Sequence, residues 1–98
     1  MNNGDKVKVP DKIKIGPYEV KIEIVKNRAL DRDHAGEYFT RELKIDLDES
    51  YKERHGEILM HEIIEAINDL YNLNIEHHDM MVLGVALYQM LKENKLTL

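Results

Sequence analysis

Two histidines and two glutamates in the second half of this chain could support metal-assisted hydrolysis. His61, Glu62 and Glu65 lie in the run His-Glu-Ile-Ile-Glu, and a second histidine, His77, follows sixteen residues after His61. Two imidazoles and one carboxylate form the protein ligand set of many catalytic zinc ions, and a neighbouring carboxylate can act as a general base. The residue types therefore indicate one zinc ion at His61, Glu65 and His77, with Glu62 as the base.

The predicted helix around these residues fixes how their side chains lie relative to one another. At about 100° per residue, His61 and Glu65 stand roughly 40° apart on adjacent turns, so both could contact one ion. Glu62 projects about 100° from His61, beside that ion. On the next helix, His77 falls within the apolar stripe and is expected to face inward, whereas His78 lies about 100° further round.

The N-terminal half of the chain alternates apolar and polar residues with the period of a β-strand. Residues 7–15 and 18–24 alternate on either side of a Gly-Pro turn, a pattern typical of a β-hairpin. Residues 26–35 are polar and unpatterned, and residues 36–39 and 43–47 return to an extended pattern. We therefore predict a small antiparallel or mixed β-sheet with one buried face.

In the C-terminal half the apolar pattern becomes helical. Ser50 followed by Glu53 is typical of a capping box, so a helix should begin near Tyr51. Its apolar arc comprises Leu59, Met60, Ile63, Ile64, Ala66, Ile67, Leu70 and Tyr71. Asn74 could cap a second helix over residues 75–92, antiparallel to the first because the connection is short. The apolar stripe of this second helix comprises Met80, Gly84, Leu87, Tyr88 and Leu91, with Met81 at its edge.

The length and composition of the chain are typical of a single small domain. The chain has 98 residues and no cysteine, so its fold rests on apolar packing, with the predicted metal ion as a further support. A net charge of −5 without a basic cluster argues against nucleic-acid binding. No apolar run approaches the roughly 20 residues that a bilayer requires, and the N-terminus lacks an apolar leader core. We predict a single α+β domain over residues 1–98, soluble and cytoplasmic, with the sheet first and the helix pair last.

Residues 58–94 also carry a family resemblance. With the HEIIEAIN core, the LNIEH turn and the ALYQMLKEN ending, this segment resembles small phage and prophage proteins of the minimal zincin type, relatives of the gluzincin metallopeptidases. The resemblance implies that His61 matches the first histidine of an HExxH motif and Glu62 its catalytic glutamate. It also implies that Glu65 stands at the second histidine and His77 at the glutamate of the following helix. The two ligand types are thus exchanged, and a set of two histidines and one glutamate is preserved.

The resemblance implies a zinc-dependent metallopeptidase. Zinc would polarise the scissile carbonyl and acidify a bound water, Glu62 would take the proton, and a donor opposite would stabilise the oxyanion. Tyr38, His34 and Tyr88 are the candidate donors, and the sequence does not choose among them. A peptide or protein could pair along the strand at residues 36–39, as zincin substrates do at a sheet edge. The substrate and the oligomeric state stay open.

Other interpretations also stay open. The acidic and histidine residues of the first helix could simply form its solvated face. A catalytically inactive, metal-stabilised module could instead hold a host or phage protein along an edge strand. The motifs Glu62-x-x-Glu65 and Glu76-x-x-Asp79 are also similar to the Mg²⁺ site of MazG-type nucleotide pyrophosphohydrolases, an all-helical family. The residues expected to be ordinary surface histidines are His34, His55 and His78.

Overall fold

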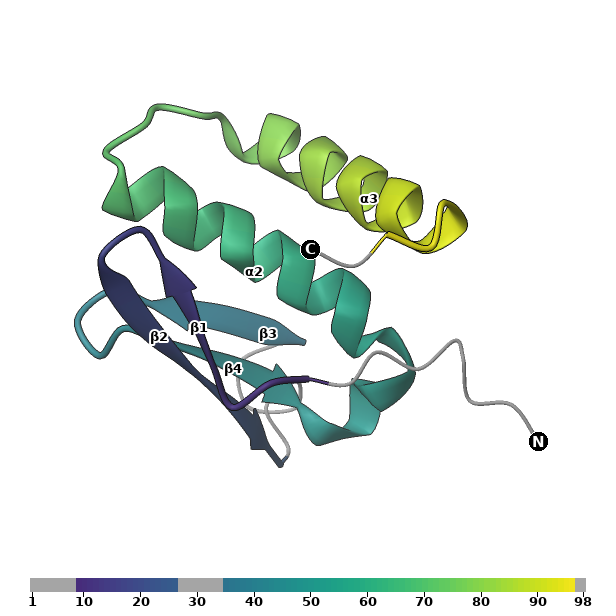
Figure 1. Cartoon of the computed structure of the whole chain (residues 1–98). Coiled ribbons are helices and arrows are strands. Elements are labelled where there is room, and N and C mark those ends of the chain that lie inside the picture. Colours follow the sequence, from purple (N-terminus) through teal and green to yellow (C-terminus); the bar gives the residue numbers. More distant parts are fainter. Residues whose placement is uncertain (1–8, 27–34, 97–98) are drawn as a thin grey trace.

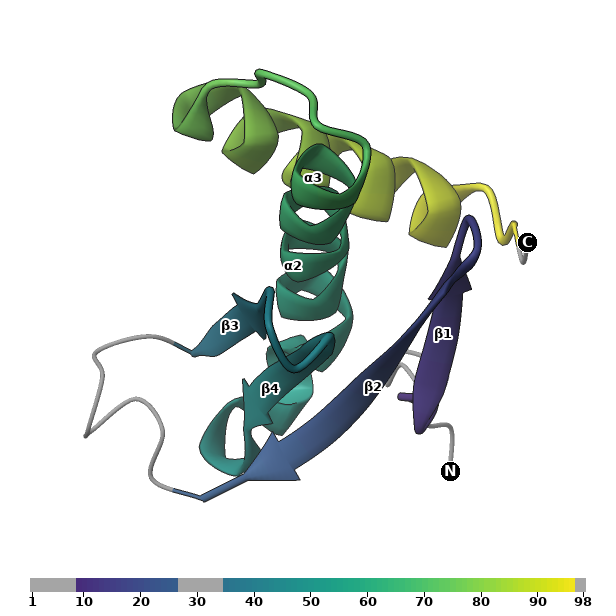
Figure 2. The same ribbon diagram turned by 90° about the vertical axis from the view of Figure 1, so that its left-hand side faces the viewer.

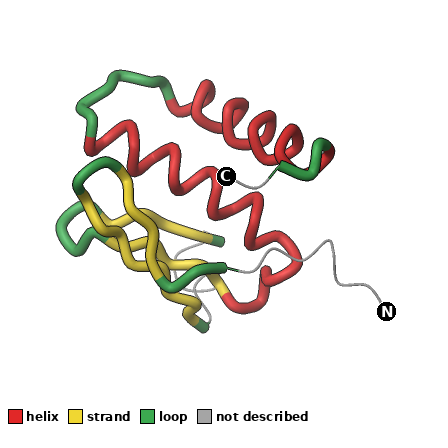
Figure 3. The backbone as a smooth tube through the Cα atoms, viewed as in Figure 1, coloured by secondary structure: helices red, strands yellow, loops and turns green. Residues whose placement is uncertain are grey.

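The computed structural model describes residues 9–26 and 35–96, which form a four-stranded sheet and two packed helices (Figure 1). The strands are β1 (Lys12–Ile15), β2 (Tyr18–Val25), β3 (Gly36–Phe39) and β4 (Lys44–Asp48). The helical segments are η1 (Glu49–Arg54), α2 (His55–Leu70) and α3 (His77–Glu93). α2 and α3 lie together on one side of the strands (Figure 3). This is the predicted α+β architecture, with the sheet first and the helix pair last.

The sheet is mixed, with the strand order β1-β2-β4-β3. β1 and β2 form the predicted antiparallel hairpin, and Gly16 at its turn has a φ of 58°, which favours glycine. β4 pairs in parallel with β2 and antiparallel with β3, so β3 lies at one edge of the sheet. The start of the first predicted strand, most of the predicted 26–35 loop and His34 lie outside the described residues.

The core lies between the sheet and α2. The apolar residues Val20 and Ile22 of β2 and Ile45 and Leu47 of β4 point toward the helix and are buried, while Asp46 and Asp48 of β4 are buried too, so burial does not alternate along β4. The buried apolar cluster comprises Ile15, Val20, Ile22, Ile45, Leu47, Ile58, Leu59 and Ala66. The predicted arc on α2 is confirmed for its central residues, but Tyr71 at its end is 52% exposed. Because the core fixes one face of α2, the side chains on its flank are held beside the edge strand β3.

Both helices begin at residues other than those predicted. Asp48, not Ser50, caps η1, since its carboxylate accepts hydrogen bonds from the Ser50 amide at 2.8 Å and the Ser50 hydroxyl at 2.6 Å. α2 then begins at His55, which is buried rather than at the surface, with Nε2 2.7 Å from the carbonyl oxygen of Asp48. α3 follows Glu76, and the predicted cap at Asn74 is also wrong.

α3 packs on α2, running back along it (Figure 1) and crossing it obliquely (Figure 2). Gly84 faces His61 where the helices meet, and a Cβ at this position would lie 3.4 Å from the Cα of His61, an ordinary contact distance. Met80 and Gly84 are buried, as predicted, whereas Leu87 of the predicted stripe is 38% exposed. Neither helix in the described ranges combines the length and apolar character that crossing a bilayer demands.

Candidate functional site

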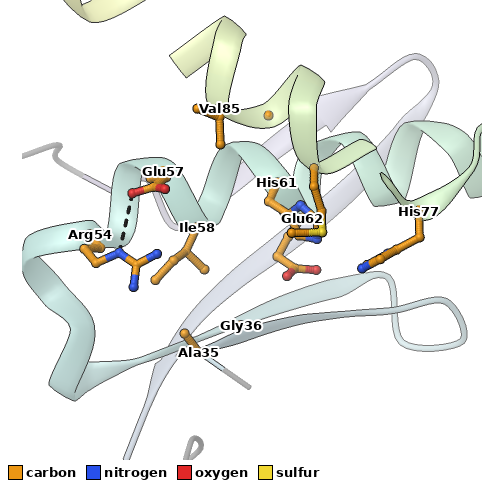
Figure 4. A pocket seen from close by; sticks show the side chains of 11 residues that line it. Ala35, Gly36, Arg54, Glu57, Ile58, His61, Glu62, His77 and Val85 are labelled. Atoms are coloured by element: carbon orange, nitrogen blue, oxygen red, sulfur yellow. Dashed lines mark hydrogen bonds and ion pairs between the residues drawn. The ribbon is translucent and has the colours of Figure 1, made fainter. Parts of the chain in front are cut away.

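α2 carries three of the four predicted site residues on adjacent turns. His61 Nε2 lies 3.3 Å from Glu65 Oε2, as expected for residues four apart on a helix. These two side chains are 26% and 30% exposed, whereas Glu62 is buried at 8%. Figure 4 shows His61 and Glu62 side by side above the strand layer. α2 therefore presents an imidazole and a carboxylate at its flank and a second carboxylate toward the interior.

His77, the first residue of α3, brings the second imidazole to the same place. Its Nδ1 lies 3.7 Å from Glu65 Oε2, the oxygen that His61 also contacts. The two imidazole rings stand at 86° to each other, with centroids 5.9 Å apart. The ring of His77 lies beside that of His61, but the prediction that His77 faces inward is wrong, because its side chain is 69% exposed. His77 therefore lies at the rim of the site rather than in the interior.

Two distances between these atoms match the separation of two ligands on one zinc ion, but the three side chains do not form a metal site as they stand. Two ligand atoms about 2.0–2.2 Å from a tetrahedral ion stand roughly 3.3–3.6 Å from each other, close to the 3.3 and 3.7 Å contacts of Glu65 Oε2. As the side chains stand, no three His, Cys, Asp or Glu residues in the ranges 9–26 and 35–96 form a group that could hold a metal. Both imidazoles converge on one carboxylate oxygen, so metal binding would require rotation of Glu65 or His77, whose side chains both reach solvent.

The edge of β3 faces these four residues. Three consecutive residues of β3, 36–38, line a pocket of about 290 Å³ together with all four predicted site residues. Among the described strands β3 pairs only with β4, so its other edge is available beside this pocket. Gly36 permits the close approach of β3 to α2, because a Cβ there would lie 2.6 Å from Cγ2 of Ile58, and it would touch Cγ of Glu62 at 3.4 Å. The site thus lies where an extended peptide could add to the sheet.

Tyr38 places a hydroxyl group beside this pocket. The hydroxyl donates a hydrogen bond to Asp69 Oδ2 at 3.0 Å and so connects β3 to α2. Burial, together with this hydrogen bond, raises the pKa of Tyr38 to about 12, so the hydroxyl keeps its proton at neutral pH. Tyr88, another predicted donor, lines neither of the two pockets beside His61, and His34 is outside the described residues.

Replacing Tyr38 by phenylalanine should lower the free energy of unfolding by about 0.5–1.5 kcal/mol near neutral pH, because one hydrogen bond is lost. The pKa of Tyr38 is about 12 in the folded protein against 10.0 for a free tyrosine. The stability from its proton is therefore fully present below about pH 10 and is lost as pH rises toward about 12. In urea unfolding, the difference between wild type and Tyr38→Phe should shrink over this window. Tyr88→Phe is the matched control, and a difference that stays constant with pH would contradict this account.

A larger pocket continues from the same residues along α2. It has a volume of about 330 Å³ and extends from the site residues to Arg54 (Figure 4). Arg54 and Glu57 both line it and form an ion pair at 3.4 Å, and neither is among the predicted site residues. The helical period could have revealed them, because the seven-residue spacing from Arg54 to His61 places both on one face.

The second acidic motif does not take part in this site. Glu76 and Asp79 lie at the start of α3 and line neither of the two pockets beside His61. The four-stranded sheet also differs from the all-helical architecture of the magnesium-dependent pyrophosphohydrolases. The geometry therefore favours a site built from His61, Glu65 and His77 over a site built from the two acidic motifs.

Comparison of the chain with protein-family models, with curated proteins and with solved structures finds no match. The minimal zincin resemblance of residues 58–94 thus stays a prediction from the motif residues.

Proposed function

We propose that this chain is a zinc-dependent hydrolase of peptides, with one Zn²⁺ held by His61, Glu65 and His77 and with Glu62 as the general base. One observation carries the proposal: imidazole nitrogens from α2 and α3 approach the Glu65 carboxylate at 3.3 and 3.7 Å. A merely solvated helix face would not explain this arrangement, because His77 belongs to a different helix and still turns toward the pair on α2.

Each side chain has a role that follows from its position. Bound zinc would polarise the substrate carbonyl and acidify a water molecule. Glu62, buried and lining the pocket, would accept a proton from the attacking water and return it to the leaving amine. Tyr38 retains its proton, with a pKa of about 12, and could turn its hydrogen bond from Asp69 to the developing oxyanion.

The edge of β3 supports a peptide as the substrate. Residues 36–38 face the pocket along the strand edge, so backbone groups of an extended chain could pair with them beside Glu62. Such pairing uses main-chain hydrogen bonds, which every peptide sequence offers. The side chains lining the pockets would then supply what selectivity the site has.

The zinc content of the purified protein tests the ligand set. Elemental analysis should find about one zinc per chain in protein prepared without chelators. His77→Ala should weaken zinc binding at least about tenfold, because one of three ligands is lost. His78→Ala changes the exposed neighbouring histidine and should leave zinc affinity unchanged. Magnesium in place of zinc, or equal zinc affinity in His77→Ala and wild type, would refute the ligand set.

α3 supports a second candidate function, that of a catalytically inactive, metal-stabilised module that binds another protein. Six large apolar residues of α3 are 38–53% exposed, namely Met81, Val82, Leu83, Val85, Leu87 and Met90. The helix carries no charge from Met80 to Leu91, and a helix apolar on all sides is normally buried. Exposed apolar surface of this kind marks interaction sites. Binding through α3 would not depend on Glu62, whereas hydrolysis would.

A further inference from the structure

Arg54 and His77 mark the two ends of the larger pocket. The pocket is lined by residues of α2 and α3 and by Ala35 and Gly36 at the start of β3, and Figure 4 shows the Arg54 guanidinium at one end and the His77 ring at the other. α2 begins at His55, six residues before His61, so Arg54, the last residue of η1, lies about 10 Å from His61 along the helix axis. An extended peptide covers this distance with about three residues.

The guanidinium of Arg54 can take an anion. Within the described ranges it pairs through Nε with Glu57 Oε1 at 3.4 Å, and the two side chains are 57% and 39% exposed. Such an exposed pair stabilises the fold little. The contact uses one edge of the guanidinium and leaves the two terminal nitrogens available for a ligand. Their planar arrangement matches the two oxygens of a carboxylate.

The direction of β3 determines which end of a peptide would reach Arg54. Gly36 lies against Ile58, near the start of α2, whereas Tyr38 bonds to Asp69, near its end. β3 therefore runs from the Arg54 end of the pocket toward the far end of α2. A peptide antiparallel to β3 would point its C-terminus at Arg54. A parallel peptide would bring an N-terminal ammonium there, which the guanidinium would repel.

We propose that Arg54 binds the C-terminal α-carboxylate of a peptide that lies antiparallel to β3, a proposal that rests on the hydrolase function proposed above. The pocket then holds about three residues beyond the scissile bond. Water adds across that bond, so that the shortened peptide gains a carboxylate and a fragment of about three residues leaves with a new amine. Ile58, Met81 and Val85 line the pocket between its ends and favour apolar side chains in that fragment.

Binding to the Glu62→Gln variant tests the proposal without turnover. Amide NMR titrations would use acetyl-Gly-Val-Leu-Val-Ala with a free carboxylate, the same peptide as a C-terminal amide, and an amidated peptide ending in glutamate. We expect the free carboxylate to bind about tenfold more tightly than the plain amide. Adding Arg54→Gln should abolish that difference. Adding Lys52→Gln, which removes an exposed lysine outside the pocket, should preserve it.

Other results of these titrations would overturn either the carboxylate site or the hydrolase function. Equal binding of acid and amide, or a preference that survives Arg54→Gln, overturns the proposal. Tight binding of the amidated glutamate peptide would assign Arg54 to an acidic side chain and also overturns it. Titrations with and without zinc separate a carboxylate held by Arg54 from one held by the metal. If wild type hydrolyses no peptide while the Arg54-dependent preference persists, the hydrolase function fails and the carboxylate site stands.

Discussion

Glu62→Gln should reduce peptide hydrolysis by about 10²–10⁴-fold, the usual contribution of a general base. Glutamine keeps the size of the glutamate at a position that is only 8% exposed, but its amide cannot accept the proton of the attacking water. Because Glu62 is not one of the proposed ligands, the zinc content should stay that of the wild type. The measurement is kcat/KM on a mixture of quenched-fluorescent hexapeptides with free carboxylates, together with elemental analysis of the same samples.

The matched control is Glu53→Gln, which removes an exposed carboxylate of η1 and should leave turnover unchanged. Equal unfolding free energies for the two variants would show that a loss of activity is not a loss of fold. Full activity in Glu62→Gln would exclude Glu62 as the base. A zinc-loaded wild type without turnover would exclude the hydrolase and leave the protein-binding role of α3.

The strands could be predicted from the sequence because their alternation has a single physical cause. Val20 and Ile22 flank a charged residue, as do Ile45 and Leu47, and all four point into the apolar core between the sheet and α2. A shift of one residue in register would turn these side chains to the outer face. The pairing of β4 with β2 in parallel was left open, because the alternation specifies faces and not neighbours.

Helix starts were harder to predict, because several side chains compete for the same free amides. Asp48 lies two residues before Ser50 and binds both its amide and its hydroxyl, so Ser50 itself does not cap the helix. In the connection between α2 and α3, the side-chain oxygen of Asn68 accepts a hydrogen bond from the Ile75 amide at 3.0 Å. Asn68 comes from the preceding helix, so this contact depends on the tertiary fold.

In the candidate site, too, contacts within one helix could be predicted from the sequence, whereas contacts between elements could not. His61 and Glu65 meet because they are four residues apart on one helix, which the sequence alone dictates. His77 joins them only because the chain turns between the helices and α3 packs back across α2. Glu62 faces β3 because β4 places that strand at the sheet edge. Neither arrangement is encoded in a local pattern.

Gly36→Ala should lower the free energy of unfolding by about 1–3 kcal/mol, the usual cost of forcing an extra carbon into a packed site. A Cβ at residue 36 would lie 2.6 Å from Cγ2 of Ile58 and 3.2 Å from the carbonyl oxygen of Asp46. Ile58 is buried and β-branched, and the carbonyl is part of the neighbouring strand, so neither can move easily. β3 must then shift away from α2, which should also weaken zinc and peptide binding at the edge. Urea unfolding with unchanged m-values measures the loss.

Gly84→Ala is the matched control and should change stability in the opposite direction. Its Cβ would meet His61 Cα at 3.4 Å and Cβ at 3.6 Å, ordinary contact distances, while alanine inside a helix gains about 0.5–1 kcal/mol over glycine. A double-mutant cycle with Ile58→Ala tests where the strain of Gly36→Ala arises. The Ile58→Ala protein lacks the Cγ2 methyl, so Gly36→Ala should lower the free energy of unfolding less in that protein than in the wild type. Additive costs, or a Gly36→Ala protein as stable as wild type, would show that β3 does not press against α2 at this point.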